Sequence, residues 1–236
     1  MNQAMKTKTS QQRRNSAFSL LELLVVVTII AILSAVMIPG GAVVVGMAKR
    51  AAAAEHAKQI VIGLRAYSID NGGQFPGGRN QYGQPIATSN DAFRDMLEYV
   101  DYNEKIFTVS GSMWGATADL KTTSPGEMLR PGENHFAYIA GVSPDARGQW
   151  PLVVDGTDGS GTYSEHVSER GGLWKGKYAV VGRVDGSVGP ERLKGDGEVR
   201  YLPKFDDPTK DGLNVASYMG GGARLLDPAA GTGASE

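Results

Sequence analysis

The ionisable residue in the least ordinary setting is Glu22, because it lies inside the most apolar stretch of the chain. Residues 17–38 read AFSLLELLVVVTIIAILSAVMI and contain no other charged side chain. A carboxylate inside an apolar, lipid-facing helix is costly and tends to require a partner that neutralises it. The sequence leaves two interpretations open: Glu22 pairs with a cationic group, or it lies near lipid headgroups and is simply solvated.

A second set of carboxylates, Asp155 and Asp158, lies in the segment DGTDGS. Hard cations prefer carboxylate and carbonyl oxygens in flexible loops, so this segment is the one calcium candidate that the sequence offers. Its spacing departs from the EF-hand pattern, and a plain turn is the default interpretation. His135 and His166 lack metal-ligand spacing, and no nucleophile motif surrounds them. We therefore expect no cofactor, no catalytic residues and no enzymatic activity.

The elements that would position Glu22 begin with a basic leader. Residues 1–16 contain four Lys or Arg residues and no acid, and the apolar stretch that follows is long enough to span a bilayer as a helix. The positive flank predicts a cytoplasmic N-terminus and an external C-terminal domain. A secretory signal cut near residues 40–42, a twin-arginine signal at residues 13–14, an unprocessed signal anchor and a prepilin signal all remain as interpretations of this segment.

The prepilin interpretation is favoured by a resemblance. Ala17-Phe18-Ser19-Leu20-Leu21-Glu22 and the apolar residues after them resemble the class III signal of type IV pilins and type II secretion pseudopilins. The resemblance implies cleavage between Ala17 and Phe18, N-methylation of Phe18, and a role for Glu22 in assembly. In the family, Gly usually precedes the cut, so Ala17 is a departure that we expect to slow processing.

The same resemblance implies a structural subunit of a pilus-like filament, most similar to a type II secretion pseudopilin. Its partners would be a prepilin peptidase, copies of itself and other pilin-like subunits, membrane lipid, and an inner-membrane assembly platform with its ATPase. Its location would be the inner membrane in a single pass, and the filament after assembly. The alternative is a membrane-tethered extracytoplasmic binding domain that uses the helix only as an anchor. The net charge of −1 argues against a nucleic-acid partner.

Four segments follow from the composition: a leader at 1–17, a long helix at 18–70, a globular domain at 71–205 and a Gly/Ala-rich tail at 206–236. Pro39, Gly40 and Gly41 are expected to break or kink the helix just after its transmembrane part, 18–38. Beyond them, an amphipathic helix is predicted, with a seam at Met47, Ala51, Ala54, Ala57, Val61 and Leu64. This seam suits either a helix bundle at a filament core or the buried face of a domain helix. We expect the tail to be poorly packed outside 213–226.

The globular domain is predicted to be α+β, with a small antiparallel sheet packed on the long helix in a pilin-like arrangement. A short helix is expected at 91–100, capped by Asn90 or Asp91. Strands are expected at 105–109, 135–142, 150–154, 178–184 and 199–202. Asp185-Gly186 predicts a hairpin. The segments at 150–156, 171–172 and 185–188 resemble pseudopilins of secretion systems more than adhesive pilins, and the lack of cysteine agrees with this.

Overall fold

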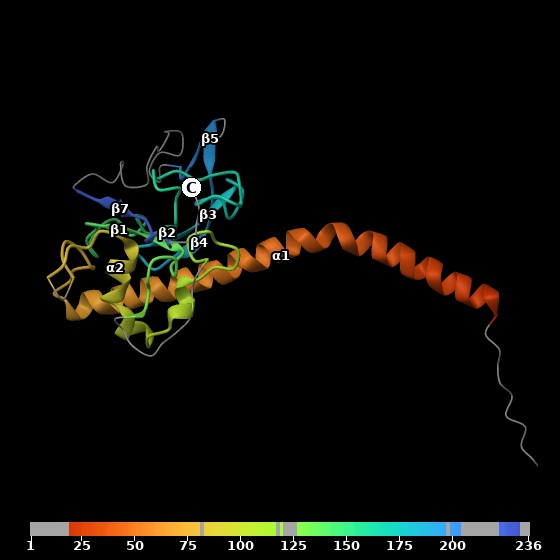
Figure 1. Cartoon of the computed structure of the whole chain (residues 1–236), viewed down its shortest axis with the longest axis horizontal. Coiled ribbons are helices and arrows are strands. Elements are labelled where there is room, and N and C mark those ends of the chain that lie inside the picture. The colour runs from red at the N-terminus through yellow and green to blue at the C-terminus, as the bar shows by residue number, and fades with distance from the viewer. Residues whose placement is uncertain are drawn as a thin grey trace, which may run out of the picture. The chain divides into compact units, whose positions relative to one another are not determined.

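The structure, a computed structural model, describes residues 19–80, 83–116, 119, 127–196, 199–203 and 222–231, with the backbone alone at 36–42, 196 and 199. The chain divides into two compact units between Gly46 and Met47, and each is described by itself. The first unit holds the beginning of helix α1, which runs from Leu20 to Asp70. The second holds the end of α1 and a mixed helical and β-sheet domain (Figure 1).

The sheet of the second unit is antiparallel and has five strands in the order β4-β3-β2-β1-β7. The strands are β1 Phe136–Ala140, β2 Pro151–Asp155, β3 Tyr178–Arg183, β4 Val188–Arg192 and β7 Arg224–Leu226. A separate two-stranded sheet pairs β5 Lys194–Asp196 with β6 Val199–Tyr201. The predicted combination of a long helix with an antiparallel sheet is therefore confirmed.

The end of α1 packs on this sheet through a stripe of side chains that recur every three to four residues. Ala53, Ala57, Ile60, Val61 and Leu64 are at most 1% exposed. A close approach occurs at Gly182 of β3, where an added Cβ would lie 2.7 Å from Cγ2 of Val61. Glycine at this position therefore lets the helix approach the strand.

Only part of the predicted seam on α1 is buried in this domain. Ala57, Val61 and Leu64 are buried as expected, but Met47 and Ala51 are exposed and Ala54 is only half-buried. Contact with the core begins at Ala53, so the apolar residues before it in this unit have no core to pack on. Periodicity identified the face of the helix but not the point at which burial starts.

The predicted helix at 91–100 divides into two pieces, α2 Ser89–Arg94 and the 3₁₀-helix η1 Leu97–Val100. Its cap is Thr88, not Asn90 or Asp91: the Thr88 hydroxyl accepts from the Asp91 N–H, while the Asp91 carboxylate accepts from the Thr88 N–H at 3.0 Å. This reciprocal pair is a capping box. The helix begins before the predicted residue 91, because Thr88 and Asp91 stand at the three-residue spacing that a capping box requires.

The predicted strand at 105–109 is also wrong, since residues Glu104–Phe107 form the 3₁₀-helix η2. Ile106 and Phe107 are adjacent and both buried, a pattern that a one-sided strand cannot produce. The strands expected at 135–142, 150–154, 178–184 and 199–202 match β1, β2, β3 and β6. The turn of the β3–β4 hairpin contains Gly186 at φ +88°, as the Asp-Gly signal predicted.

The tail is packed at β7, which adds to β1 at the edge of the sheet and lies inside the stretch 213–226 that was excepted from the expectation of poor packing. Just beyond β7, the Asp227 carboxylate accepts from both the N–H and the hydroxyl of Thr157. Of the predicted tail, residues 206–221 and 232–236 lie outside the described residues.

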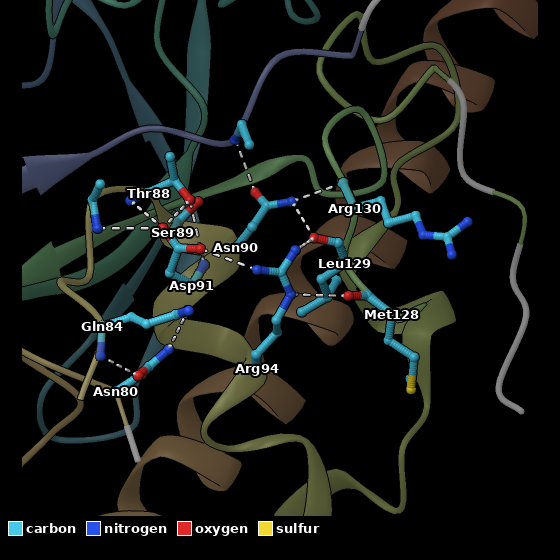
Figure 2. A network of polar contacts seen from close by, with 12 residues as sticks. Asn80, Gln84, Thr88, Ser89, Asn90, Asp91, Arg94, Met128, Leu129 and Arg130 are labelled. Atoms are coloured by element: carbon cyan, nitrogen blue, oxygen red, sulfur yellow. Dashed lines mark hydrogen bonds and ion pairs between the residues drawn. The ribbon is translucent and has the colours of Figure 1, made fainter. Parts of the chain in front are cut away.

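A polar network around the buried side chain of Asn90 fixes the loop at 127–134 to α2 (Figure 2). Asn90 donates to the carbonyls of Leu129 and Arg130 at 2.9 and 3.0 Å and accepts from the N–H of Ala229 at 2.9 Å. Arg94 donates to the carbonyls of Met128 and Leu129. One helix of six residues thus holds both the loop and the segment that follows β7.

Candidate functional site

The start of α1 is defined by two hydrogen bonds of Ser19, one with Glu22 and one with Leu21. The Ser19 N–H donates to Oε2 of Glu22 at 3.2 Å, and the Leu21 N–H donates to Oγ of Ser19 at 3.3 Å. This Ser-x-x-Glu arrangement forms only the Glu half of a capping box, because the Ser19 hydroxyl accepts from the N–H of Leu21 and not from that of Glu22. The carboxylate lies at the positive end of the helix dipole. Glu22 thus has a local partner that the sequence analysis missed, although the spacing was readable.

From Leu23 to Leu33, α1 is apolar on every side. The large apolar side chains between Leu20 and Leu33 are 46–87% exposed. Residues 23–27 are all large and apolar, and at 3.6 residues per turn five consecutive residues cover the whole circumference of a helix. A helix that is apolar all round is stable only where lipid or other apolar surfaces cover it. Even so, within the described residues no helix combines the length and the apolar content needed to cross a membrane.

Several predicted site residues lie outside the described residues or are described by their backbone alone. Ala17 and Phe18, the predicted cleavage and methylation residues, lie outside the described residues, as do the side chains of 36–38 at the end of the predicted span. The backbone of residues 39–41 is helical, so Pro39, Gly40 and Gly41 do not end α1. The side chains of residues 39–41 lie outside the described atoms, and a kink of the helix at this point stays a prediction.

Both carboxylates of the predicted calcium loop accept hydrogen bonds from the protein itself. Asp155 is 2% exposed, and its oxygens accept from Nε2 of His135, Nε1 of Trp174 and the N–H of Val180. The carboxylate of Asp158 accepts from the N–H and hydroxyl groups of Ser160 and Thr162. Burial raises the pKa of Asp158, but these hydrogen bonds outweigh it and the pKa lies below its usual range. The two carboxylates therefore act as acceptors for separate parts of the chain.

The structure also assembles a Ser-His-Asp relay that the sequence analysis did not find. Oγ of Ser112 lies 2.6 Å from Nδ1 of His135, and Nε2 of His135 lies 2.9 Å from Oδ1 of Asp155. All three side chains are buried. The residues lie 23 and 20 positions apart in no known motif, so no sequence signal could have connected them.

The surroundings of this relay indicate a packing role. In the hydrolase triad the serine pairs with Nε2 and the aspartate with Nδ1, whereas here the two nitrogens are exchanged. Oγ of Ser112 also accepts from the N–H groups of Trp114 and Gly115, at 3.1 and 3.4 Å. An added Cβ at Gly156 would lie 2.6 Å from the carbonyl oxygen of His135, so the chain passes too closely for a substrate to enter there.

Comparison with known proteins identifies the apolar N-terminal segment. Residues 12–38 match the model of the prokaryotic N-terminal methylation motif. The chain carries a type IV pilin and pseudopilin signal. The matched segment contains Ser19 and Glu22, whose side chains cap the start of α1, and much of the apolar part of that helix. No curated protein sequence and no solved structure shows significant similarity to the chain.

Proposed function

We propose that this protein is a structural subunit of a type IV pilus-like filament, of the type II secretion pseudopilin kind. The observation that carries the proposal is the coincidence of the methylation motif at 12–38 with the first stretch of α1, which is apolar on every side and bears one acid. A prepilin peptidase would cut between Ala17 and Phe18 and methylate the new terminus. The chain would then be held in the inner membrane with its C-terminal domain outside.

The capping geometry supports a specific use of Glu22. Its carboxylate is at the first turn of α1, where cleavage before Phe18 would create a free α-amine one residue before Ser19. Because Glu22 already accepts from the Ser19 N–H of its own chain, it is held at the helix end, and its remaining lone pairs are free to accept from the amine of a neighbouring subunit. Such a pair would neutralise both charges and set the axial stagger. Other pilin-like subunits, an assembly platform and its ATPase would complete the machinery.

The alternative is a membrane-tethered binding domain that uses the N-terminal helix only as an anchor. Two substitutions separate the proposals. Glu22→Gln keeps an acceptor for the Ser19 N–H but removes the charge, whereas Ser19→Ala removes the hydroxyl of the cap and keeps the charge. For a filament subunit, Glu22→Gln abolishes assembly, measured by electron microscopy and crosslinking, while membrane insertion persists.

Ser19→Ala is the matched control and should assemble, because the charge of Glu22 is retained. Assembly of Glu22→Gln at the wild-type level would show that charge pairing between subunits is not used. A wild-type chain that never forms homo- or hetero-oligomers in its native membrane would favour the anchored binding domain.

A further inference from the structure

Three carboxylates meet beside the 127–134 loop. One oxygen each of Glu104, Asp119 and Glu133 lies within 4.8 Å of the others. Glu104 belongs to η2 and is 1% exposed, and Glu133 is 4% exposed, while Asp119 is at the surface. The cluster is therefore open to solvent on one side and closed on the other.

The position of Glu104 is fixed, but only one of its two oxygens has a donor. Oε1 accepts from the N–H of Leu129 at 2.7 Å, whereas Oε2 is fully buried and has no hydrogen-bond partner. A buried carboxylate oxygen without a donor or a cation is strongly unfavourable. Within the described parts of the chain, neither Glu104 nor Glu133 forms an ion pair with Lys or Arg.

Glu133 is held just as firmly on the other side of the cluster. Its Oε2 accepts from the N–H of Arg130 at 2.6 Å, within the loop that Asn90 and Arg94 attach to α2. Both buried carboxylates are thus placed by backbone donors from one loop, Leu129 for Glu104 and Arg130 for Glu133. Two like charges fixed at this separation repel unless something positive lies between them.

We propose that Glu104, Glu133 and Asp119 bind a divalent cation of calcium size. Calcium takes oxygen ligands at about 2.3–2.6 Å, so two oxygens on opposite sides of the ion stand about 5 Å apart, which agrees with the spacing of the cluster. The donor set contains only carboxylates, with no histidine or cysteine, and such sets select hard cations over zinc or copper. Solvent at the exposed side of Asp119 supplies the remaining ligands as water.

One other arrangement would relieve the repulsion, namely a proton shared between Glu104 and Glu133. Burial and the neighbouring charge of Glu133 raise the pKa of Glu104, which favours that proton. The two arrangements differ in what they bind. A cation site responds to calcium at neutral pH, and a shared proton does not.

The test uses the full chain, purified in detergent, treated with EDTA and dialysed against a metal-free buffer at about pH 7. We expect calorimetric titration with CaCl₂ to give saturable binding of one ion per chain and the midpoint of thermal unfolding to rise by several degrees. Glu104→Gln and Glu133→Gln should each remove the binding heat and the thermal shift. Glu127→Gln, an exposed glutamate of the same loop that pairs with Arg130, is the matched control and should respond like the wild type.

A second readout protects the test against variants that merely unfold. In EDTA, Glu104→Gln should be at least as stable as the wild type, because the substitution removes the uncompensated charge and keeps an acceptor for the Leu129 N–H. The proposal is overturned if the wild type gives no binding heat and no thermal shift at millimolar calcium. It is equally overturned if Glu104→Gln and Glu133→Gln bind calcium as the wild type does. The proposed filament function does not enter this test.

Discussion

Replacing Asp155 by alanine should be among the most destabilising single changes in the β-sheet domain. The Asp155 carboxylate is 2% exposed and accepts from His135 at 2.9 Å, from Trp174 at 2.6 Å and from the N–H of Val180 at 2.7 Å. It therefore connects β1, β2, β3 and the loop that carries Trp174. Alanine would leave these three donors without their acceptor.

The magnitude follows from how many of these donors stay buried. His135 and the backbone of Val180 are enclosed, whereas Trp174 is half-buried and can reach water. Each buried donor left without a partner costs about 1–3 kcal/mol, and breaking a buried charged network costs about 3–5 kcal/mol. We expect Asp155→Ala to lower the free energy of unfolding by about 3–5 kcal/mol, a large part of the 5–15 kcal/mol typical of a domain.

Denaturant unfolding of the full chain in detergent, followed by tryptophan fluorescence, measures this loss. The matched control is Asp145→Ala, because Asp145 is exposed and its substitution should change the free energy by less than about 0.5 kcal/mol. Ser112→Ala should cost less than Asp155→Ala, since it removes a single hydroxyl from the end of the relay. An Asp155→Ala protein within 1 kcal/mol of the wild type, by the scale of ordinary substitutions, would refute the assigned packing role.

Two further predictions concern the helix–sheet contact and the loop at 155–160. Gly182→Ala places a methyl group 2.7 Å from Cγ2 of Val61 and should lower the free energy of unfolding by about 1–3 kcal/mol. Adding Val61→Ala should recover part of this loss in denaturant unfolding. Losses that are purely additive in the double variant would contradict the contact. The pKa of Asp158 is lowered in the folded state, because its hydrogen bonds outweigh burial. Its stabilisation is therefore present above the unfolded pKa of about 4 and is lost as the pH falls through the folded value. Asp158→Ala should lower the free energy of unfolding by about 1 kcal/mol at neutral pH and by progressively less below about pH 4. A series of unfolding midpoints at different pH values measures this. A loss that does not change with pH would contradict the assigned role of the Asp158 carboxylate.

The sequence predicted most of the sheet because β1, β2 and β3 are predominantly apolar runs bounded by turn residues. It failed where neighbouring side chains alone do not decide the structure. Ile106 and Phe107 read as a strand, yet both are buried in a 3₁₀-helix. The edge strand β7 is defined by its pairing with β1, which no local pattern records.

The site residues divide in the same way. The motif at the N-terminus is local, so its composition and spacing carried the prediction, and the Ser19–Glu22 cap was readable at the same spacing. The carboxylates of Glu104 and Glu133, by contrast, come together only through the fold, as do the side chains of Ser112 and His135. Side chains that only the fold brings together can be identified only from the structure.

The central claim is that the chain is processed as a prepilin before it acts. The most direct test is the intact mass and the N-terminal residue of the protein purified from its native membrane. The account predicts a mature chain that begins at Phe18 and carries a methyl group on its α-amine. A chain that begins at Met1, or one cut near Val43, would contradict it.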